Sequence, residues 1–476
     1  MLFSSISFIF YFLPAVLLCY FIVPVRFRSI RNAVLLVFSL IFYGIGGPKF
    51  LFVMLFSIIL NYILGLAVWY TQKQAFLNKC LLTVSVVCNL GVLCYFKYTN
   101  FFLSNFFAVL GREFQSLNIV MPIGISFFTF QGLSYVVDVY RNTAKVQKNP
   151  LNVALYISMF PQLIAGPIVR YETVAGQISE RHENVDQFAS GIRRFSVGLA
   201  KKMLIGNTMG LIAEQAFGHP TMEVSTATLW LAMAAYTLHI YYDFSGYSDM
   251  AIGLGRMFGF EFLENFNYPY ISKSITEFWR RWHISLSTWF RDYVYIPLGG
   301  NRCSKSKWIR NIFVVWLLTG FWHGASWNFI CWGLYFGVLL LLEKLWIGSY
   351  LKSMPDWMQH IYALLLIMFG WVLFNSANMA SALKYFAGLF GLGTGCLLDK
   401  QFLYLIMEYK VELIIGVIAA IPWRAVITER MKQKNCFVST ENMRLLAANV
   451  YALLLLCFSV IVLVNSSFNP FIYFRF

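Results

Sequence analysis

The stretch "WIRNIFVVWLLTGFWHGASWNFICWGLYFGVLLLLEKLW", residues 308–346, is almost unbroken by charge and carries His323 near its middle. A straight helix of this length would extend about 58 Å, roughly twice the ~30 Å hydrocarbon core of a bilayer. The segment must therefore break, tilt steeply or turn back. Gly320 and Gly324 flank His323 and are the expected break points. We therefore expect His323 at a helix discontinuity inside the membrane, surrounded by protein or a water-filled cavity.

A histidine in such a place has two interpretations. A neutral imidazole with water access on one side is suited to act as a general base. Alternatively, the ring bonds a backbone carbonyl that the helix break has freed, and its role is structural. The residues alone leave both interpretations open.

The composition identifies the medium as a membrane. The 476 residues are 59% hydrophobic and only 12% charged, whereas soluble domains are about 25% charged. Runs that cross a bilayer must be helical, because lipid cannot satisfy backbone groups. We therefore predict one all-α, polytopic membrane domain over residues 1–476, with about ten or eleven crossings. The apolar runs are 5–24, 50–69, 79–96, 151–169, 224–242, 309–345, 356–374, 402–421 and 444–464.

The basic residues follow a topological pattern. Arg26, Arg28 and Arg31 come after the first apolar run and none precedes it, so this run is not typical of a signal peptide. The positive-inside rule then places the N-terminus outside the cytoplasm. The other basic loops, predicted to be cytoplasmic, are 141–148, 193–202, 273–310 and 424–434. Topology and anionic lipid headgroups account for the net charge of +16, so we expect no nucleic-acid partner.

Other common function classes have no signature. The nine cysteines are scattered and odd in number, which favours neither a disulfide framework nor a metal site. The sequence contains no Walker loop, dinucleotide fingerprint or visible internal repeat, so an ATP-driven pump or repeat-built transporter is not favoured.

Polar residues interrupt the apolar segment "YTLHIYYDFSGYSDMAIGLGRMFGF" that begins at residue 236. Carboxylates at membrane depth normally face a bundle interior or a water-filled cavity. We therefore interpret Asp243, Ser245 and, further along, Asn328 as residues that line a channel. Gly246 is expected to break the helix. The alternative is a structural hydrogen-bond cluster that ties helices together.

Residues 266–310 are too polar to span a membrane. Ser274 and Glu277 resemble a capping box, which predicts a helix from about residue 275. Phe278, Trp282, Leu286 and Trp289 then recur at helical spacing. This pattern predicts one amphipathic helix whose aromatic face lies at the membrane interface.

The polar side of this predicted helix suggests a donor site. Arginine matches phosphate geometry, so a basic cytoplasmic lip would suit a phosphorylated donor. The alternative is simple interfacial anchoring. The expected donor-binding residues are Arg280, Arg281, Arg291 and Trp282, and His283 lies beside them.

Together these features suggest direct group transfer. The sequence has no Ser-x-x-Lys, Gly-x-Ser-x-Gly or zinc signature. We hypothesise that His323 takes a proton from an acceptor hydroxyl, whose oxygen attacks an activated carbonyl held by a phosphorylated carrier. Such a reaction needs neither a metal nor a covalent enzyme intermediate.

The stretches "FWRRWHISLSTWFRDYVYIPLGGNR" (278–302) and "LLTGFWHGASWNFICWGLYFG" (317–337) closely resemble the membrane-bound O-acyltransferase (MBOAT) family. Within it, the chain is most similar to the branch that contains the membrane subunit of alginate O-acetylation. The similarity runs nearly end to end and includes "MPIGISFFTFQGLSYVVDVYR" (121–141), "MFPQLIAGPIVRY" (159–171), "YYDFSGYSDMAIG" (241–253) and "NPFIYFRF" (469–476).

The resemblance implies a ring-like bundle of tilted helices with re-entrant and interfacial helices. It implies that His323 is the membrane-embedded catalytic histidine and that His283 is the second histidine of this branch. Acetyl-CoA would be the donor substrate, with no bound cofactor or metal. The acetyl group would serve O-acetylation of an extracellular or cell-envelope polysaccharide from the bacterial inner membrane. A separate extracytoplasmic acetyltransferase or polysaccharide-export protein is the implied partner, beside membrane lipids.

Two alternatives remain at this point. One is D-alanyl transfer to teichoic acids within the same family. The other is a non-enzymatic transporter or flippase, in which intramembrane His and Asp residues line a path. Acyl-CoA consumption distinguishes the enzyme from the transporter.

Overall fold

The computed structural model describes residues 1–218, 224–423, 441–466 and 468–469. These residues form helices and connections and contain no β-strand. The basic loop 424–434 and nearly all of the terminal stretch 469–476 lie outside the described residues. Contacts divide the chain into two compact units, residues 1–195 with 247–263 and residues 196–246 with 264–476. The single domain over residues 1–476 stays a prediction.

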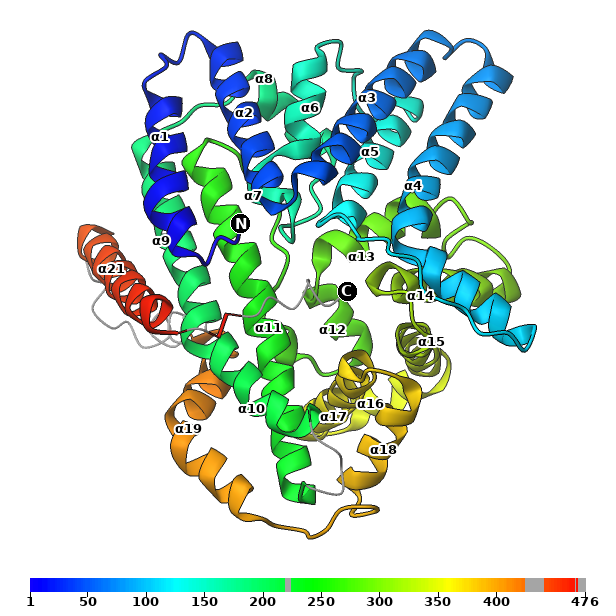
Figure 1. Ribbon diagram of the computed structural model, residues 1–476, viewed down its shortest axis with the longest axis vertical. Coiled ribbons are helices and arrows are strands. Elements are labelled where there is room, and N and C mark those ends of the chain that lie inside the picture. The colour runs from blue at the N-terminus through cyan, green and yellow to red at the C-terminus, as the bar shows by residue number, and fades with distance from the viewer. Residues whose placement is uncertain (219–223, 424–440, 467, 470–476) are drawn as a thin grey trace. The chain divides into compact units, whose positions relative to one another are not determined.

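The first unit contains the N-terminal helices. In it α3, α4 and α5 pack against one another, and α2 packs on α6 (Figure 1). Its elements are η1 (Phe8–Phe12), α1 (Leu13–Phe21), α2 (Arg28–Gly46), α3 (Pro48–Tyr70), α4 (Ala75–Val109), α5 (Ile125–Tyr140), α6 (Pro150–Ser158), α7 (Phe160–Leu163), α8 (Tyr171–Ser179) and most of α9 (Val185–Ala200).

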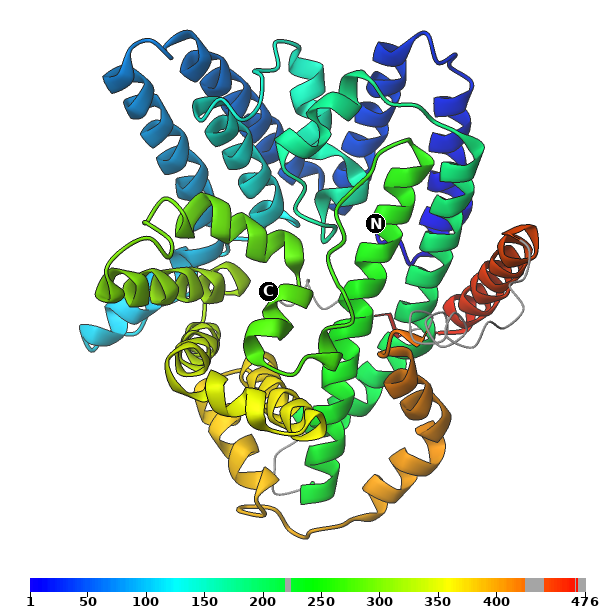
Figure 2. The ribbon, with the colours of Figure 1, turned by 180° about the vertical axis from the view of Figure 1, so that it is seen from behind.

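The second unit contains both candidate catalytic histidines. The hairpin of α14 and α15 packs against α17 and α12, and Figure 2 shows these helices from behind. Its elements are η2 (Lys201–Gly206), α10 (Asn207–Phe217), the first part of α11 (Thr226–Met257), η4 (Pro269–Ile271), α12 (Ile275–Arg281), α13 (Ile284–Phe290), η5 (Arg291–Tyr295), α14 (Lys305–His323), α15 (Trp327–Leu342), η6 (Glu343–Ile347), α16 (Gly348–Ser353), α17 (Asp356–Asn375), α18 (Met379–Leu389), α19 (Lys400–Ala419) and α21 (Glu441–Asn465).

Six helical segments of the described chain are long and apolar enough to cross a membrane, which supports a multi-pass protein. They are α2, α3, α4, Trp327–Ser353, α17 and Asn442–Asn465. Other predicted runs fold differently: residues 151–169 form the short helices α6 and α7, and α19 is interrupted at Tyr409. The count of ten or eleven crossings therefore stays a prediction.

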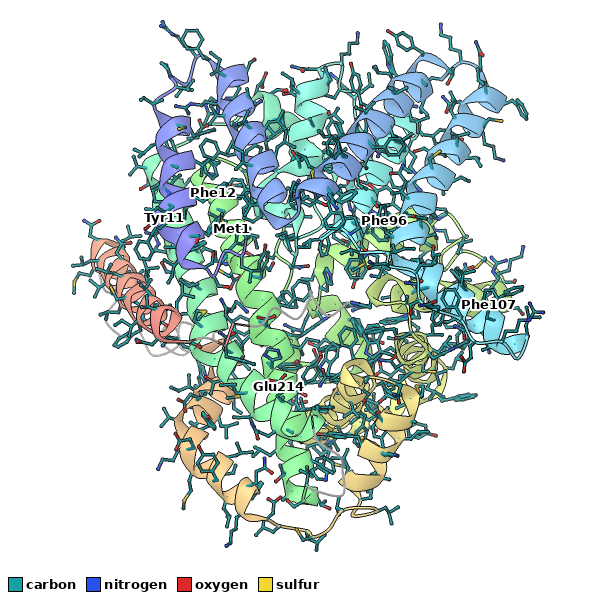
Figure 3. All side chains as sticks on the ribbon, viewed as in Figure 1. Met1, Tyr11, Phe12, Phe96, Phe107 and Glu214 are labelled. Carbon is teal, nitrogen blue, oxygen red and sulfur yellow. The ribbon has the colours of Figure 1, made fainter. Side chains whose placement is uncertain are left out.

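Helix surfaces alternate between packed and exposed apolar side chains, as expected of a protein surrounded by lipid. In η1, Phe12 is buried, whereas its neighbour Tyr11 is 73% exposed (Figure 3). On α4, Phe102 and Phe106 are likewise more than half exposed. Water would penalise such surfaces, and hydrocarbon does not.

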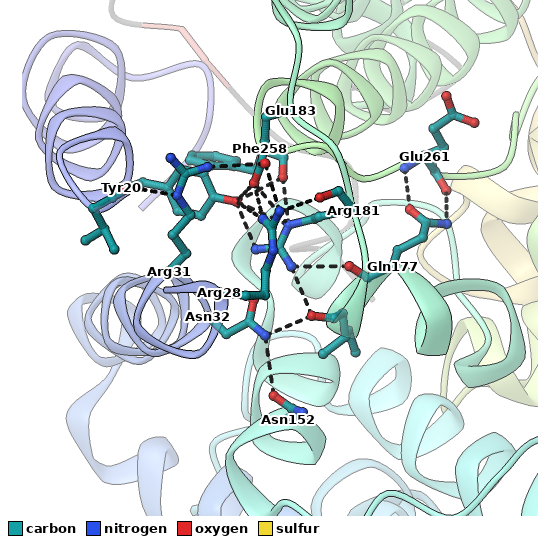
Figure 4. A network of polar contacts seen from close by, with 12 residues as sticks. Tyr20, Arg28, Arg31, Asn32, Asn152, Gln177, Arg181, Glu183, Phe258 and Glu261 are labelled. Carbon is teal, nitrogen blue, oxygen red and sulfur yellow. Dashed lines mark hydrogen bonds and ion pairs between the residues drawn. The ribbon is translucent and has the colours of Figure 1, made fainter. Parts of the chain in front are cut away.

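An ion network in the first unit uses arginines that the sequence explained by topology alone. Arg28 and Arg31 both pair with Glu183, and the hydroxyl of Tyr20 donates a hydrogen bond to the same carboxylate (Figure 4). The Arg181 guanidinium donates to the Phe258 carbonyl at 3.0 Å. Since Arg31 is almost fully buried, it serves internal pairing rather than contact with lipid headgroups.

Candidate active site

The long apolar stretch breaks where expected, directly after His323. Helix α14 ends at His323, Gly324 is extended, and α15 begins at Trp327. A Cβ on Gly324 would collide with the Phe329 ring, so the turn requires glycine for lack of space. The prediction that Gly320 is a second break point is wrong. It lies within α14, where a Cβ would overlap the Phe329 carbonyl oxygen of α15.

His323 is buried in an aromatic environment. Its ring meets Trp322, Trp332 and Phe374 edge-on, with centroids 4.9, 5.0 and 5.1 Å away. These neighbours come from α14, α15 and α17, so three helices determine the orientation of the imidazole. Tight aromatic walls leave the ring little rotational freedom.

The polar segment that carries His283 differs from the predicted single helix. It forms two short helices, α12 and α13, separated at Trp282 and His283. His283 has a left-handed backbone, with φ 44° and ψ 53°. A non-glycine residue in this region costs on the order of 1–3 kcal/mol and persists only where neighbours impose it. Such strain is common at functional sites.

The start of α12 agrees with the predicted capping box. The Ser274 hydroxyl accepts a hydrogen bond from the Glu277 amide at 3.0 Å. The Glu277 carboxylate reaches back to the Lys273 amide at 2.9 Å, one residue before the usual partner.

The prediction that this aromatic face lies at the membrane interface is wrong. Phe278, Trp282, Leu286 and Trp289 are all buried within the protein. Trp282 packs on Phe266 and Trp371, for example, with ring centroids 5.0 and 4.9 Å apart. The helical spacing correctly predicts one apolar face, but protein rather than lipid covers this face.

The structure brings the two predicted histidines to one indole ring. The centroid of His283 lies 5.8 Å from that of Trp322, and that of His323 lies 4.9 Å from it. The Phe244 ring of α11 packs edge to face against the His283 ring, with centroids 4.7 Å apart. A polar loop segment and a helix break, 40 positions apart in the sequence, thus meet in one buried site.

The His283 imidazole is neutral at physiological pH. It lies outside the six candidate spans, and its burial lowers its pKa to about 3. Its Nδ1 lies 3.1 Å from the side-chain oxygen of Asn265, while Nε2 is buried and has no hydrogen-bond partner among the described residues. Sequence reasoning missed Asn265, because no local motif marks it.

Glu343 is a second residue that the sequence did not reveal. Its carboxylate accepts hydrogen bonds from the amides of Ile275 and Thr276 at 2.6 and 2.8 Å. The hydroxyl of Thr276 donates to it at 2.6 Å. A buried carboxylate from the end of α15 therefore satisfies the first N–H groups of α12 and holds this helix in place.

We expect Glu343→Ala to loosen α12 and thereby displace His283. One buried and one partly buried amide would lose a charged acceptor, which should lower the free energy of unfolding by on the order of 2–4 kcal/mol. Thermal unfolding in detergent measures this loss. Glu343→Gln keeps one carbonyl acceptor and should lose less. Equal stability of Glu343→Ala and wild type would refute the capping role.

The expected donor-binding residues fall into different environments. Arg280 is exposed and lies within electrostatic reach of Lys344, which is also exposed. Arg281 pairs with Glu277 at 2.9 Å, and Arg291 pairs with its neighbour Asp292 at 2.6 Å. Trp282 is packed among aromatic rings. Donor binding by these four residues stays a prediction, and Arg280 is the best placed of them.

The expected channel-lining residues are buried and mostly tied to neighbours. Asp243 pairs with Lys202 at 2.5 Å, and neither side chain exposes any surface. Asn328 donates to the Ser376 carbonyl at 2.7 Å, while the buried Ser245 hydroxyl has no hydrogen-bond partner in the described part of the chain. Their channel-lining role stays a prediction. Gly246 does not break the helix, because α11 continues through it.

Metal binding has no structural support in the described ranges. Among those residues, no group of three His, Cys, Asp or Glu side chains lies close enough to hold an ion. The expected absence of a metal stays a prediction.

Comparisons with known proteins agree on one family. The sequence model of MBOAT, the membrane-bound O-acyltransferase family, matches residues 71–383. A probable alginate O-acetylase of Azotobacter vinelandii is 40% identical, with both chains covered completely. A peptidoglycan O-acetyltransferase of Helicobacter pylori is 36% identical over 84% of this chain and 82% of its own. A teichoic acid D-alanyltransferase of Bacillus subtilis is 35% identical, but over only 47% of this chain and 59% of its own.

Proposed function

Because the chain belongs to the membrane-bound O-acyltransferase family, we propose that this multi-pass O-acyltransferase transfers acetyl groups from cytoplasmic acetyl-CoA for O-acetylation of an extracellular or cell-envelope polysaccharide. We assign the general base to His323. The observation that carries the proposal is the convergence of His323 and His283 on Trp322 in a buried site.

The relatives support the acetyl group and the glycan acceptor. The reported relatives from Azotobacter vinelandii and Helicobacter pylori, which cover most of this chain, are named for O-acetylation of alginate and of peptidoglycan, both glycan polymers. The D-alanyltransferase covers less than half of this chain. Acetylation is therefore favoured over D-alanyl transfer.

The surroundings of His323 suit the proposed chemistry. His323 would take the proton of an acceptor hydroxyl as that oxygen attacks the thioester carbonyl carbon of acetyl-CoA. An ester C–O bond forms, the C–S bond breaks, and the sulfur leaves as CoA and gains the proton. The aromatic walls would exclude water, which limits hydrolysis of the thioester.

The protein would contact the donor through the phosphates of acetyl-CoA. Arg280 and Lys344 form an exposed basic pair next to the segment that carries His283. Guanidinium and ammonium groups suit the phosphates of CoA. We propose this pair as the cytoplasmic contact for the donor, in the bacterial inner membrane. A separate extracytoplasmic acetyltransferase or export protein would complete delivery to the polymer.

Deletion of the gene should remove ester-linked acetate from extracellular or envelope polysaccharide, and the wild-type gene should restore it. Membranes that contain the protein should also release free CoA from acetyl-CoA. Alkali-labile acetate and free thiol measure the two effects. Unchanged acetate together with a loss of D-alanyl esters would overturn the proposal in favour of D-alanyl transfer.

A further inference from the structure

One side-chain oxygen organises the turn that carries His283. The Oδ1 atom of Asn265 accepts hydrogen bonds from the Ser285 amide at 3.1 Å and the Ser285 hydroxyl at 2.9 Å. The same oxygen lies 3.1 Å from His283 Nδ1. In addition, the Asn265 carbonyl accepts from the Ile284 amide at 2.9 Å. Asn265 is completely buried and lies 18 residues before His283.

These contacts determine which way the Asn265 amide points. A backbone N–H can only donate, so the Asn265 atom that faces the Ser285 amide must be oxygen. The reversed amide would bring two donors together. The Asn265 Nδ2 atom has no hydrogen-bond partner among the described residues, so no contact of that atom opposes this orientation.

The orientation of the amide in turn determines the protonation of the ring. Two oxygens face His283 Nδ1: Asn265 Oδ1 at 3.1 Å, which can only accept, and the Ser285 hydroxyl at 3.5 Å, whose hydrogen is donated to Asn265. A neutral imidazole therefore carries its proton on Nδ1 in order to donate there. The other nitrogen, Nε2, then holds an available lone pair. Nε2 is buried and lacks a partner among the described residues, so it is positioned to accept a hydrogen bond from a bound molecule.

We propose that Asn265 is a positioning residue that holds His283 in the Nδ1–H tautomer, so that Nε2 accepts a hydrogen bond from a second hydroxyl of the acceptor glycan, beside the hydroxyl that attacks. The hydrogen bond from the acceptor to Nε2 rests on the proposed function. In this tautomer Nε2 cannot donate to a developing oxyanion or protonate the leaving thiolate. His283 therefore orients the acceptor glycan through its second hydroxyl, and His323 removes the proton of the attacking hydroxyl.

The first test reads the tautomer without any need for activity. Nitrogen-15 NMR of histidine-labelled protein distinguishes protonated from unprotonated ring nitrogens, and His283→Gln identifies the His283 signals among the six histidines. We expect a proton on Nδ1 and none on Nε2 at neutral pH. A proton on Nε2, or a doubly protonated ring, would overturn the proposal even if acetyl transfer is confirmed.

The second test uses variants of the organising residues. Asn265→Ala should yield a mixture of tautomers and lower kcat by about 10- to 100-fold, the range known for lost orienting partners of metal-bound histidines, with little change in KM for acetyl-CoA. Asn265→Asp keeps the acceptor oxygen and should retain the Nδ1–H tautomer. Ser285→Ala keeps the backbone N–H and should retain it too. An Nδ1–H signal and normal kcat in Asn265→Ala would show that Asn265 is dispensable.

Discussion

His323→Ala should abolish polysaccharide acetylation while the protein remains in the membrane at its normal level. General-base catalysis contributes about 10²- to 10⁴-fold, so the rate should fall by at least this range. The loss should appear in kcat, because the donor contacts proposed for Arg280 and Lys344 stay intact. Ester-linked acetate in a deletion strain restored with each variant, at matched membrane abundance, measures the effect.

Two further variants separate chemistry from packing at this position. His323→Phe retains an aromatic ring against Trp322, Trp332 and Phe374 but cannot accept a proton, so it should fail as His323→Ala does. His182→Ala changes an exposed histidine and should restore acetylation fully. Full activity of His323→Phe would make His323 a packing residue and move the base elsewhere.

The features that the sequence predicted well depend on local signals. The apolar stretch 308–346 is too long for one membrane-spanning helix, which predicts a helix break, and the break occurs at Gly324. The cap of α12 follows from Ser274 and Glu277, which are three residues apart. The cap depends on residues one helical turn apart, and the break depends on the length of one continuous segment, so both can be predicted without knowledge of distant partners.

The features that it missed depend on distant partners. Glu343 reaches α12 across 68 positions, and Asn265 reaches His283 across 18. The aromatic period of residues 278–289 showed correctly that one face is apolar. However, a period cannot distinguish burial against Trp371 from burial in lipid, because both environments reward the same residues.

The close contact of α14 and α15 was also not predicted from the sequence, although two glycines produce it. A Cβ on Gly333 would lie well inside 3.0 Å of the Trp316 carbonyl oxygen, and one on Gly320 would overlap the Phe329 carbonyl oxygen. Both obstacles are backbone atoms, which no rotamer change can move. Gly320 is one turn before His323, and Gly333 follows Trp332, so this contact sets the distance between the His323 ring and the Trp332 ring.

Gly320→Ala and Gly333→Ala should therefore inactivate the enzyme, although both variants keep His323 and His283. Alanine favours a helix over glycine by about 1 kcal/mol, yet forcing the helices apart should cost about 1–3 kcal/mol or more and displace His323. Thermal unfolding and acetyl transfer would both fall, and the double variant should lose most. Gly91→Ala is the matched control, because it lies in α4 with no neighbour within 4 Å of its Cβ. If Gly333→Ala behaves like Gly91→Ala, the hairpin tolerates separation and its spacing does not position the site.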